Sequence, residues 1–171
     1  MGSSIAQDLQ IDMIEVEAII SRGPCLIWLP LRLGISEINP LYIEVIKKLL
    51  ECPLIVGLGG GRPKSSYYFF GYAQDDLLYL DPHITRPAIL QEEPSEDELA
   101  TYYGDVPKRM PITAIDPCFV AGFIMKDKDE LAQFSRFISD LKDSEGNCLV
   151  SLQADKRLLS MSDDGDFVDV S

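Results

Sequence analysis

The sequence lacks the features of several large classes of protein. Its 15 Lys and Arg residues are outnumbered by 28 Asp and Glu residues, which gives a formal net charge of −13. Binding to nucleic acid or to an anionic membrane surface is therefore disfavoured, because phosphate contacts need Lys and Arg. No apolar run approaches the ~18 residues of a spanning helix, and the N-terminus lacks the basic and apolar regions of a secretory signal. These absences favour a cytoplasmic protein without stable membrane insertion.

The residues that usually hold metals and phosphates are also scarce. The chain has one histidine and four widely spaced cysteines, Cys25, Cys52, Cys118 and Cys148, with no Cys-x-x-Cys pair. This arrangement does not match a four-ligand zinc pattern. The glycine run 59–61 does not form the Gly-x-x-x-x-Gly-Lys-Ser/Thr pattern of a phosphate-binding loop. We therefore expect no metal and no cofactor, and we expect reduced, structural thiols.

What is present favours one folded domain of mixed structure. The 171 residues are 46% hydrophobic and 25% charged, which is ordinary for a globular protein with a real core. Consecutive strands, two of them joined as a hairpin at 73–76, predict a mostly antiparallel α+β fold. The chain from residue 160 is small and acidic, which predicts a disordered tail. Apolar runs predict strands at 25–33, 54–58, 67–72, 77–81, 119–125 and 148–152, and helical spacing predicts helices within 5–22, 40–52 and 127–141.

The only histidine, His83, follows Asp81 and Pro82 at the end of an apolar strand pattern. Side chains two residues apart on a strand share one face, with Cα atoms roughly 6.6 Å apart. The carboxylate could then orient the imidazole, which could deprotonate a nucleophile and protonate a leaving group. The alternative for this tripeptide is a solvated turn at the end of a strand. A serine hydrolase using Ser65 or Ser66 is disfavoured, because no Gly-x-Ser-x-Gly elbow is present.

The segments around this pair form a longer pattern. Residues 60–72 read Gly-Gly-Arg-Pro-Lys-Ser-Ser-Tyr-Tyr-Phe-Phe-Gly-Tyr, and residues 78–83 read Leu-Tyr-Leu-Asp-Pro-His. Residues 29–34 read Leu-Pro-Leu-Arg-Leu-Gly, and residues 110–117 read Met-x-Ile-x-x-Ile-Asp-Pro. From about residue 25 onward, the chain resembles the autophagins, cysteine endopeptidases of the autophagy pathway.

The resemblance implies a papain-like α+β fold, a reaction and a site. Autophagins are hydrolases that cut the ubiquitin-like autophagy modifier after its C-terminal glycine and release it from phosphatidylethanolamine. By this resemblance, Asp81 and His83 are catalytic. A loop that covers the cleft of the family corresponds to Gly60, Gly61, Arg62 and Pro63. Residues 1–159 would be the C-terminal part of a papain-like catalytic domain. The enzyme would have transient access to the lipid-linked modifier.

One element of the family pattern is missing from the sequence. The nucleophilic cysteine of autophagins lies in an upstream Gly-Trp-Gly-Cys-Met segment, whereas the only tryptophan here, Trp28, lies in a strand pattern. None of the four cysteines follows glycines at the start of a helix, where a thiolate is favoured. We therefore expect the N-terminal half of the fold to be missing, and we expect this chain alone to be inactive.

The acidic tail suggests a second, non-catalytic function. Phe167 and Val170 are spaced like short motifs that add a strand to the autophagy modifier and fill two apolar pockets. The chain would then act as a decoy or adaptor that binds the modifier through residues 160–171.

Overall fold

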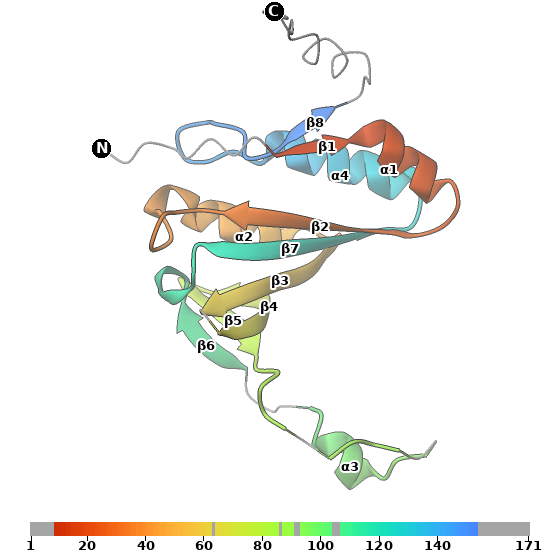
Figure 1. Cartoon of the computed structure of the whole chain (residues 1–171), viewed down its shortest axis with the longest axis vertical. Helices are drawn as coiled ribbons and strands as arrows, with labels where there is room; N and C mark the ends of the chain where they lie inside the picture. Colours follow the sequence, from red (N-terminus) through yellow and green to blue (C-terminus); the bar gives the residue numbers. More distant parts are fainter. Residues whose placement is uncertain (1–8, 63, 86, 91–92, 104–106, 154–171) are drawn as a thin grey trace, which may run out of the picture.

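The computed structural model describes residues 9–62, 64–85, 87–90, 93–103 and 107–153. Its main element is a six-stranded antiparallel sheet with strand order β2-β7-β3-β4-β5-β6 (Figure 1). A short parallel pair, β1 with β8, lies with α1 and α4 at one end of the molecule. The α+β fold with a mostly antiparallel sheet is therefore confirmed. The strands are β1 (Gln10–Asp12), β2 (Cys25–Arg32), β3 (Ile55–Arg62), β4 (Ser65–Ala73), β5 (Asp76–Leu80), β6 (Lys108–Pro111), β7 (Cys118–Met125) and β8 (Ser151–Gln153).

The helices begin where the sequence places capping residues. Asp127 caps α4 by accepting hydrogen bonds from two backbone N–H groups of its first turn, and Asp12 caps α1 in the same way. Asn39 caps the 3₁₀ turn that leads into α2, with a proline at its first position. The helices are α1 (Met13–Ile20), α2 (Ile43–Glu51), α3 (Glu96–Ala100) and α4 (Lys128–Asp140), and the 3₁₀ turns are η1 (Pro40–Tyr42) and η2 (Ile112–Ala114).

Three predicted elements differ from the structure. The strand expected at 148–152 forms only at Ser151–Gln153. The helix expected within 5–22 is shorter, because residues 10–12 pair with β8 as a strand before Asp12 starts α1. The strand expected to end at Leu58 continues through the glycines to Arg62. Gly59 and Gly60 pair with β4 on one side and with β7 on the other, so their backbone groups are held in the sheet.

The core lies on one face of the sheet, where α1, α2 and α4 pack against β2, β3, β4 and β7. Alternate residues of the strands point into it, as the period of two requires. Phe123 of β7 is fully buried, and its ring meets the edge of Phe134 of α4 at a centroid distance of 5.2 Å. Phe69 of β4 and Leu58 of β3 are also fully buried.

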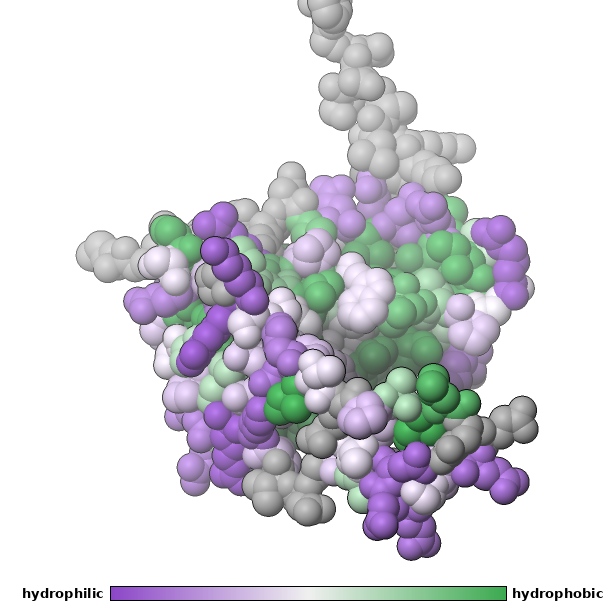
Figure 2. Space-filling model, turned by 60° about the horizontal axis from the view of Figure 1, so that its bottom comes forward, coloured by the Kyte–Doolittle hydropathy of each residue, from purple (hydrophilic) through white to green (hydrophobic). Residues whose placement is uncertain are grey.

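The other face of the sheet carries large apolar side chains that remain exposed. Trp28 of β2 is 54% exposed and lies next to Gly122 of β7, its partner across the strands. A Cβ atom on Gly122 would lie 2.7 Å from the Trp28 ring, so the indole rests directly on the glycine backbone. Leu26 and Ile124 form the next exposed pair along the same two strands. Figure 2 shows apolar residues gathered on the side of the molecule that it presents, with hydrophilic residues around them.

No helix in the described ranges is long and apolar enough to cross a membrane.

Candidate active site

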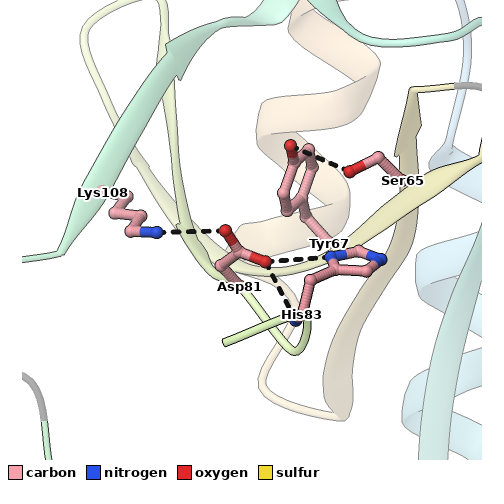
Figure 3. Close-up of polar contacts among 5 residues, drawn as sticks. All are labelled: Ser65, Tyr67, Asp81, His83 and Lys108. Atoms are coloured by element: carbon pink, nitrogen blue, oxygen red, sulfur yellow. Dashed lines mark hydrogen bonds and ion pairs between the residues drawn. The ribbon is translucent and has the colours of Figure 1, made fainter. Parts of the chain in front are cut away.

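The Asp81–His83 turn begins where β5 ends at Leu80. Asp81 Oδ1 accepts a hydrogen bond from the backbone N–H of His83 at 3.0 Å, which closes a local turn of the kind that Asp favours. The same oxygen lies 2.9 Å from Nδ1 of the His83 ring (Figure 3). Because one carboxylate oxygen holds both the backbone and the ring of His83, the turn presents the imidazole in one orientation.

The geometry sets the chemical role of each ring nitrogen. A carboxylate only accepts hydrogen bonds, so Nδ1 carries the hydrogen and donates it to Asp81. In this tautomer Nε2 is the basic nitrogen. The His83 side chain is 49% exposed, whereas that of Asp81 is 19% exposed. The pair therefore combines a shielded carboxylate with an imidazole that a substrate can reach, which is the arrangement of a general base.

Lys108 completes the polar group from the neighbouring strand β6. Its ammonium donates to Asp81 Oδ2 at 3.0 Å (Figure 3). The backbone N–H of His83, then Lys108, then the His83 ring lower the pKa of the Asp81 carboxyl to about 2. Asp81 is therefore a carboxylate throughout the neutral and mildly acidic pH range.

The lowered pKa of Asp81 predicts an acid-dependent loss of stability. A carboxyl whose folded pKa lies below its ordinary value of 3.8 stabilises the fold above pH 3.8, and this contribution disappears as the pH falls toward 2. Urea unfolding of the wild type should therefore show a steeper loss of free energy across this window than the Asp81→Asn variant shows. Parallel pH profiles for the two proteins would contradict this.

The aromatic ring of Tyr67 forms the wall behind the imidazole. Tyr67 of β4 meets the His83 ring edge to face at a centroid distance of 5.9 Å. Ser65 donates a hydrogen bond to the Tyr67 hydroxyl at 3.1 Å, which fixes the ring at the start of the same strand. Tyr79 of β5 also packs against Tyr67, at 4.7 Å between centroids. The imidazole is thus held by a carboxylate on its edge and by a cluster of aromatic rings.

A groove of about 580 Å³ opens beside Asp81. Tyr102, which follows α3, lines it and is held in place by a hydrogen bond from its hydroxyl to the Pro87 carbonyl at 2.8 Å. The groove is mostly apolar, with Lys108 and Asp81 as charged members of its lining. An extended polypeptide with apolar side chains would fit its chemistry. The other lining residues are Tyr68, Tyr79, Leu80, Pro82, Ile84, Thr101 and Tyr103.

The glycine segment expected to cover a cleft lies close to the imidazole. Gly60, Gly61 and Arg62 form the end of β3, and Pro63 lies outside the described residues. Gly61 has φ +131, and a Cβ atom there would lie 2.7 Å from the Tyr67 ring that contacts His83. The segment and the imidazole are therefore linked through one aromatic side chain.

The structure places the cysteines without identifying a nucleophile. Cys25 and Cys52 are buried, and Cys118 and Cys148 are exposed. Burial raises the pKa of the Cys52 thiol, which disfavours a thiolate there. Cys118 starts the inner strand β7 opposite Arg32 of the edge strand β2, and its backbone N–H donates to the Asp116 carboxylate. The tail residues Phe167 and Val170 lie outside the described residues.

Two residues of the site have no clear signal in the sequence. Lys108 lies in a four-residue strand that was not predicted, because Lys108–Pro111 has too little apolar alternation to indicate a strand. Tyr67 belongs to an aromatic run in which the sequence does not show which ring faces His83. Alternation along β4 could have suggested it, since Tyr67 shares a face with the buried Phe69.

Comparison with known proteins identifies the family. The model of the peptidase C54 catalytic domain matches residues 4–137. Cysteine protease ATG4B of Xenopus laevis is 41% identical over 128 residues, which cover 72% of this chain and 32% of the relative. Cysteine protease atg4 of Emericella nidulans is 38% identical over 132 residues, covering 75% and 32%. Cysteine protease atg4 of Dictyostelium discoideum is 41% identical over 103 residues, covering 60% and 14%.

The matched region contains the whole polar group described above. The chain spans about a third or less of the length of these curated relatives. It belongs to the peptidase C54 family of cysteine proteases.

Proposed function

We propose that this chain supplies the acid–base half of a cysteine endopeptidase that acts in the cytoplasm on the ubiquitin-like autophagy modifier. The substrate would be cut after the C-terminal glycine of the modifier, either before further residues or before phosphatidylethanolamine. One observation carries the proposal, namely the 2.9 Å contact between Asp81 Oδ1 and His83 Nδ1 within a C54 domain. The relatives of this chain are named cysteine proteases.

The chemistry follows from the orientation of the imidazole. Nε2 of His83 would take the proton of a cysteine thiol, and Asp81 would stabilise the imidazolium that forms. The thiolate would attack the glycine carbonyl, and the imidazolium would give its proton to the leaving amine. Water would then hydrolyse the thioester with His83 again acting as the base. Each step uses the same two residues and needs one thiol within reach of Nε2.

The thiol would come from sequence outside these 171 residues. Two of the four cysteines are buried, and the sequence places none of them after glycines at the start of a helix. The exposed apolar face around Trp28 and Ile124 also favours a further layer of polypeptide against this sheet. A chain tested by itself should therefore leave the modifier precursor uncut.

A chimera tests the proposal with the missing part restored. The 128-residue segment of the Xenopus laevis protein that aligns with this chain would be replaced by the corresponding residues of this chain. We expect the chimera to cleave a modifier precursor that carries residues after its glycine, and to be blocked by a thiol alkylating reagent. The isolated chain, with the same precursor, is the matched control.

Two outcomes would contradict the proposal in different ways. A folded chimera that leaves the precursor intact would overturn the proposed function. Cleavage by the isolated chain, lost on His83→Ala, would instead show that one of its own cysteines is the nucleophile.

A further inference from the structure

We propose that Lys108 is a positioning residue of this site, which holds Asp81 against His83 and offsets part of the negative charge that the imidazole meets. The effect of Lys108 on catalysis rests on the proposed function. The effect on His83 itself is a property of the folded chain and needs no nucleophile. Lys108 lies outside the sequence motifs that identify the family, so nothing in those motifs assigns it a role.

The two oxygens of Asp81 are divided between two partners. Oδ1 accepts from the backbone and the ring of His83, and Oδ2 accepts from Lys108 at 3.0 Å. Lys108 of β6 pairs with Tyr79 of β5. Tyr79 lies two residues before Asp81 in the chain. The sheet register thus delivers the ammonium to the side of the carboxylate that His83 does not use. Rotation of the carboxylate would break both contacts together, so Lys108 fixes the orientation that His83 requires.

The same contact changes the charge that the imidazole meets. Among the residues that the structure describes, Asp81 from the end of β5 and Tyr67 from β4 contact the imidazole, and Lys108 from β6 acts through Asp81. A lone carboxylate would favour the imidazolium strongly, whereas the ammonium bound to its other oxygen offsets part of this attraction. For a half-exposed imidazole, removal of a unit charge that lies just beyond the carboxylate shifts the titration midpoint by about 0.5–1 pH unit.

This balance has a consequence for the proposed reaction. A less basic imidazole holds less of the resting thiolate–imidazolium pair, but its imidazolium is a stronger acid toward the leaving amine. The leaving amine of a lipid conjugate or a peptide must be protonated before the carbon–nitrogen bond breaks. Lys108 therefore makes the imidazolium of His83 a better acid while Nδ1 stays bound to the carboxylate.

The single histidine makes the test direct. The NMR signals of the imidazole in the intact chain belong to His83 alone, so a pH titration gives one curve. In Lys108→Met the midpoint should rise by about 0.5–1 pH unit, a threefold to tenfold gain in proton affinity. In Lys108→Arg, which keeps the charge and can still reach the carboxylate, the midpoint should stay at the wild-type value.

A second lysine provides the matched control. Lys126 is exposed and follows the last residue of β7, Met125. The opposite end of β7 is the one near Tyr67, because Phe119 pairs with Gly60 and Gly60 pairs with Tyr67. Lys126→Met removes the same charge and should leave the midpoint unchanged. An unchanged or lowered midpoint in Lys108→Met would overturn the proposal, as would an equal rise in Lys126→Met. If Lys108→Met fails to fold by circular dichroism, Lys108→Gln is measured with the same expected rise.

The two proposals fail separately. Loss of the His83 shift with an active chimera would reject only the role of Lys108. An inactive chimera with the expected shift would reject only the proposed function.

Discussion

Replacing His83 with Ala in the active chimera is expected to lower kcat/KM for the modifier precursor by at least about 10³-fold. His83 is the only imidazole that this chain can contribute, and its Nε2 is the basic nitrogen while Nδ1 is bound to Asp81. Without it, the thiol loses its base and the leaving amine loses its acid. Cleavage of the precursor, followed by gel electrophoresis under single-turnover and steady-state conditions, measures the effect.

Two further variants make this result specific. Asp81→Asn should also reduce the rate strongly, because an amide at this position can present its N–H to Nδ1 and select the wrong tautomer. Ser66→Ala removes an exposed hydroxyl from the same hairpin and should retain activity. A chimera that keeps its rate with His83→Ala would contradict the assignment. Loss of activity in Ser66→Ala alone would favour a serine nucleophile.

Replacing Phe123 with Ala is expected to lower the free energy of unfolding by about 3–5 kcal/mol. The ring is fully buried in the centre of β7 and packs on Phe134 and Phe137 of α4. Its removal leaves a cavity between the sheet and the helix that the rigid strand cannot close. Since natural domains are stable by only about 5–15 kcal/mol, much of the variant should be unfolded at 37 °C. Urea unfolding followed by far-UV circular dichroism measures the change.

Phe70 is the matched comparison within the same sheet. It is 41% exposed and lies at the irregular pairing between β4 and β5. Phe70→Ala should therefore cost less than about 1 kcal/mol, because its ring is already partly in water. Equal losses for the two variants would show that the open face is as important for stability as the core.

The local parts of this structure could be predicted from sequence, because their causes are local. The hairpin between β4 and β5 follows from two apolar runs around 73–76, and the Asp81–His83 contact follows from residues two positions apart. The cap of α4 by Asp127 is equally local. The sheet order and the helices on one face then agree with the α+β fold that the sequence predicted.

The missed features depend on partners far away in the chain. The pairing of β1 with β8 joins residues about 140 positions apart, as the contact of Ser151 N–H with the Leu9 carbonyl illustrates. The strand predicted at 54–58 extends through the glycines of β3 because two neighbouring strands pair with their backbone groups. Lys108 joins the site only because β6 returns to β5 after a long excursion through α3. In each case tertiary pairing overrides a weak local preference.

The position of Trp28 gives this protein an internal optical reporter. It is the only tryptophan of the chain, so the indole emission has a single source. The ring is half in water on the exposed side of the sheet and rests on the backbone of Gly122. Any polypeptide that covers this side would transfer the indole from water to an apolar surrounding and shift its emission to shorter wavelengths. Binding of a polypeptide to this side of the sheet could therefore be followed in real time without a label.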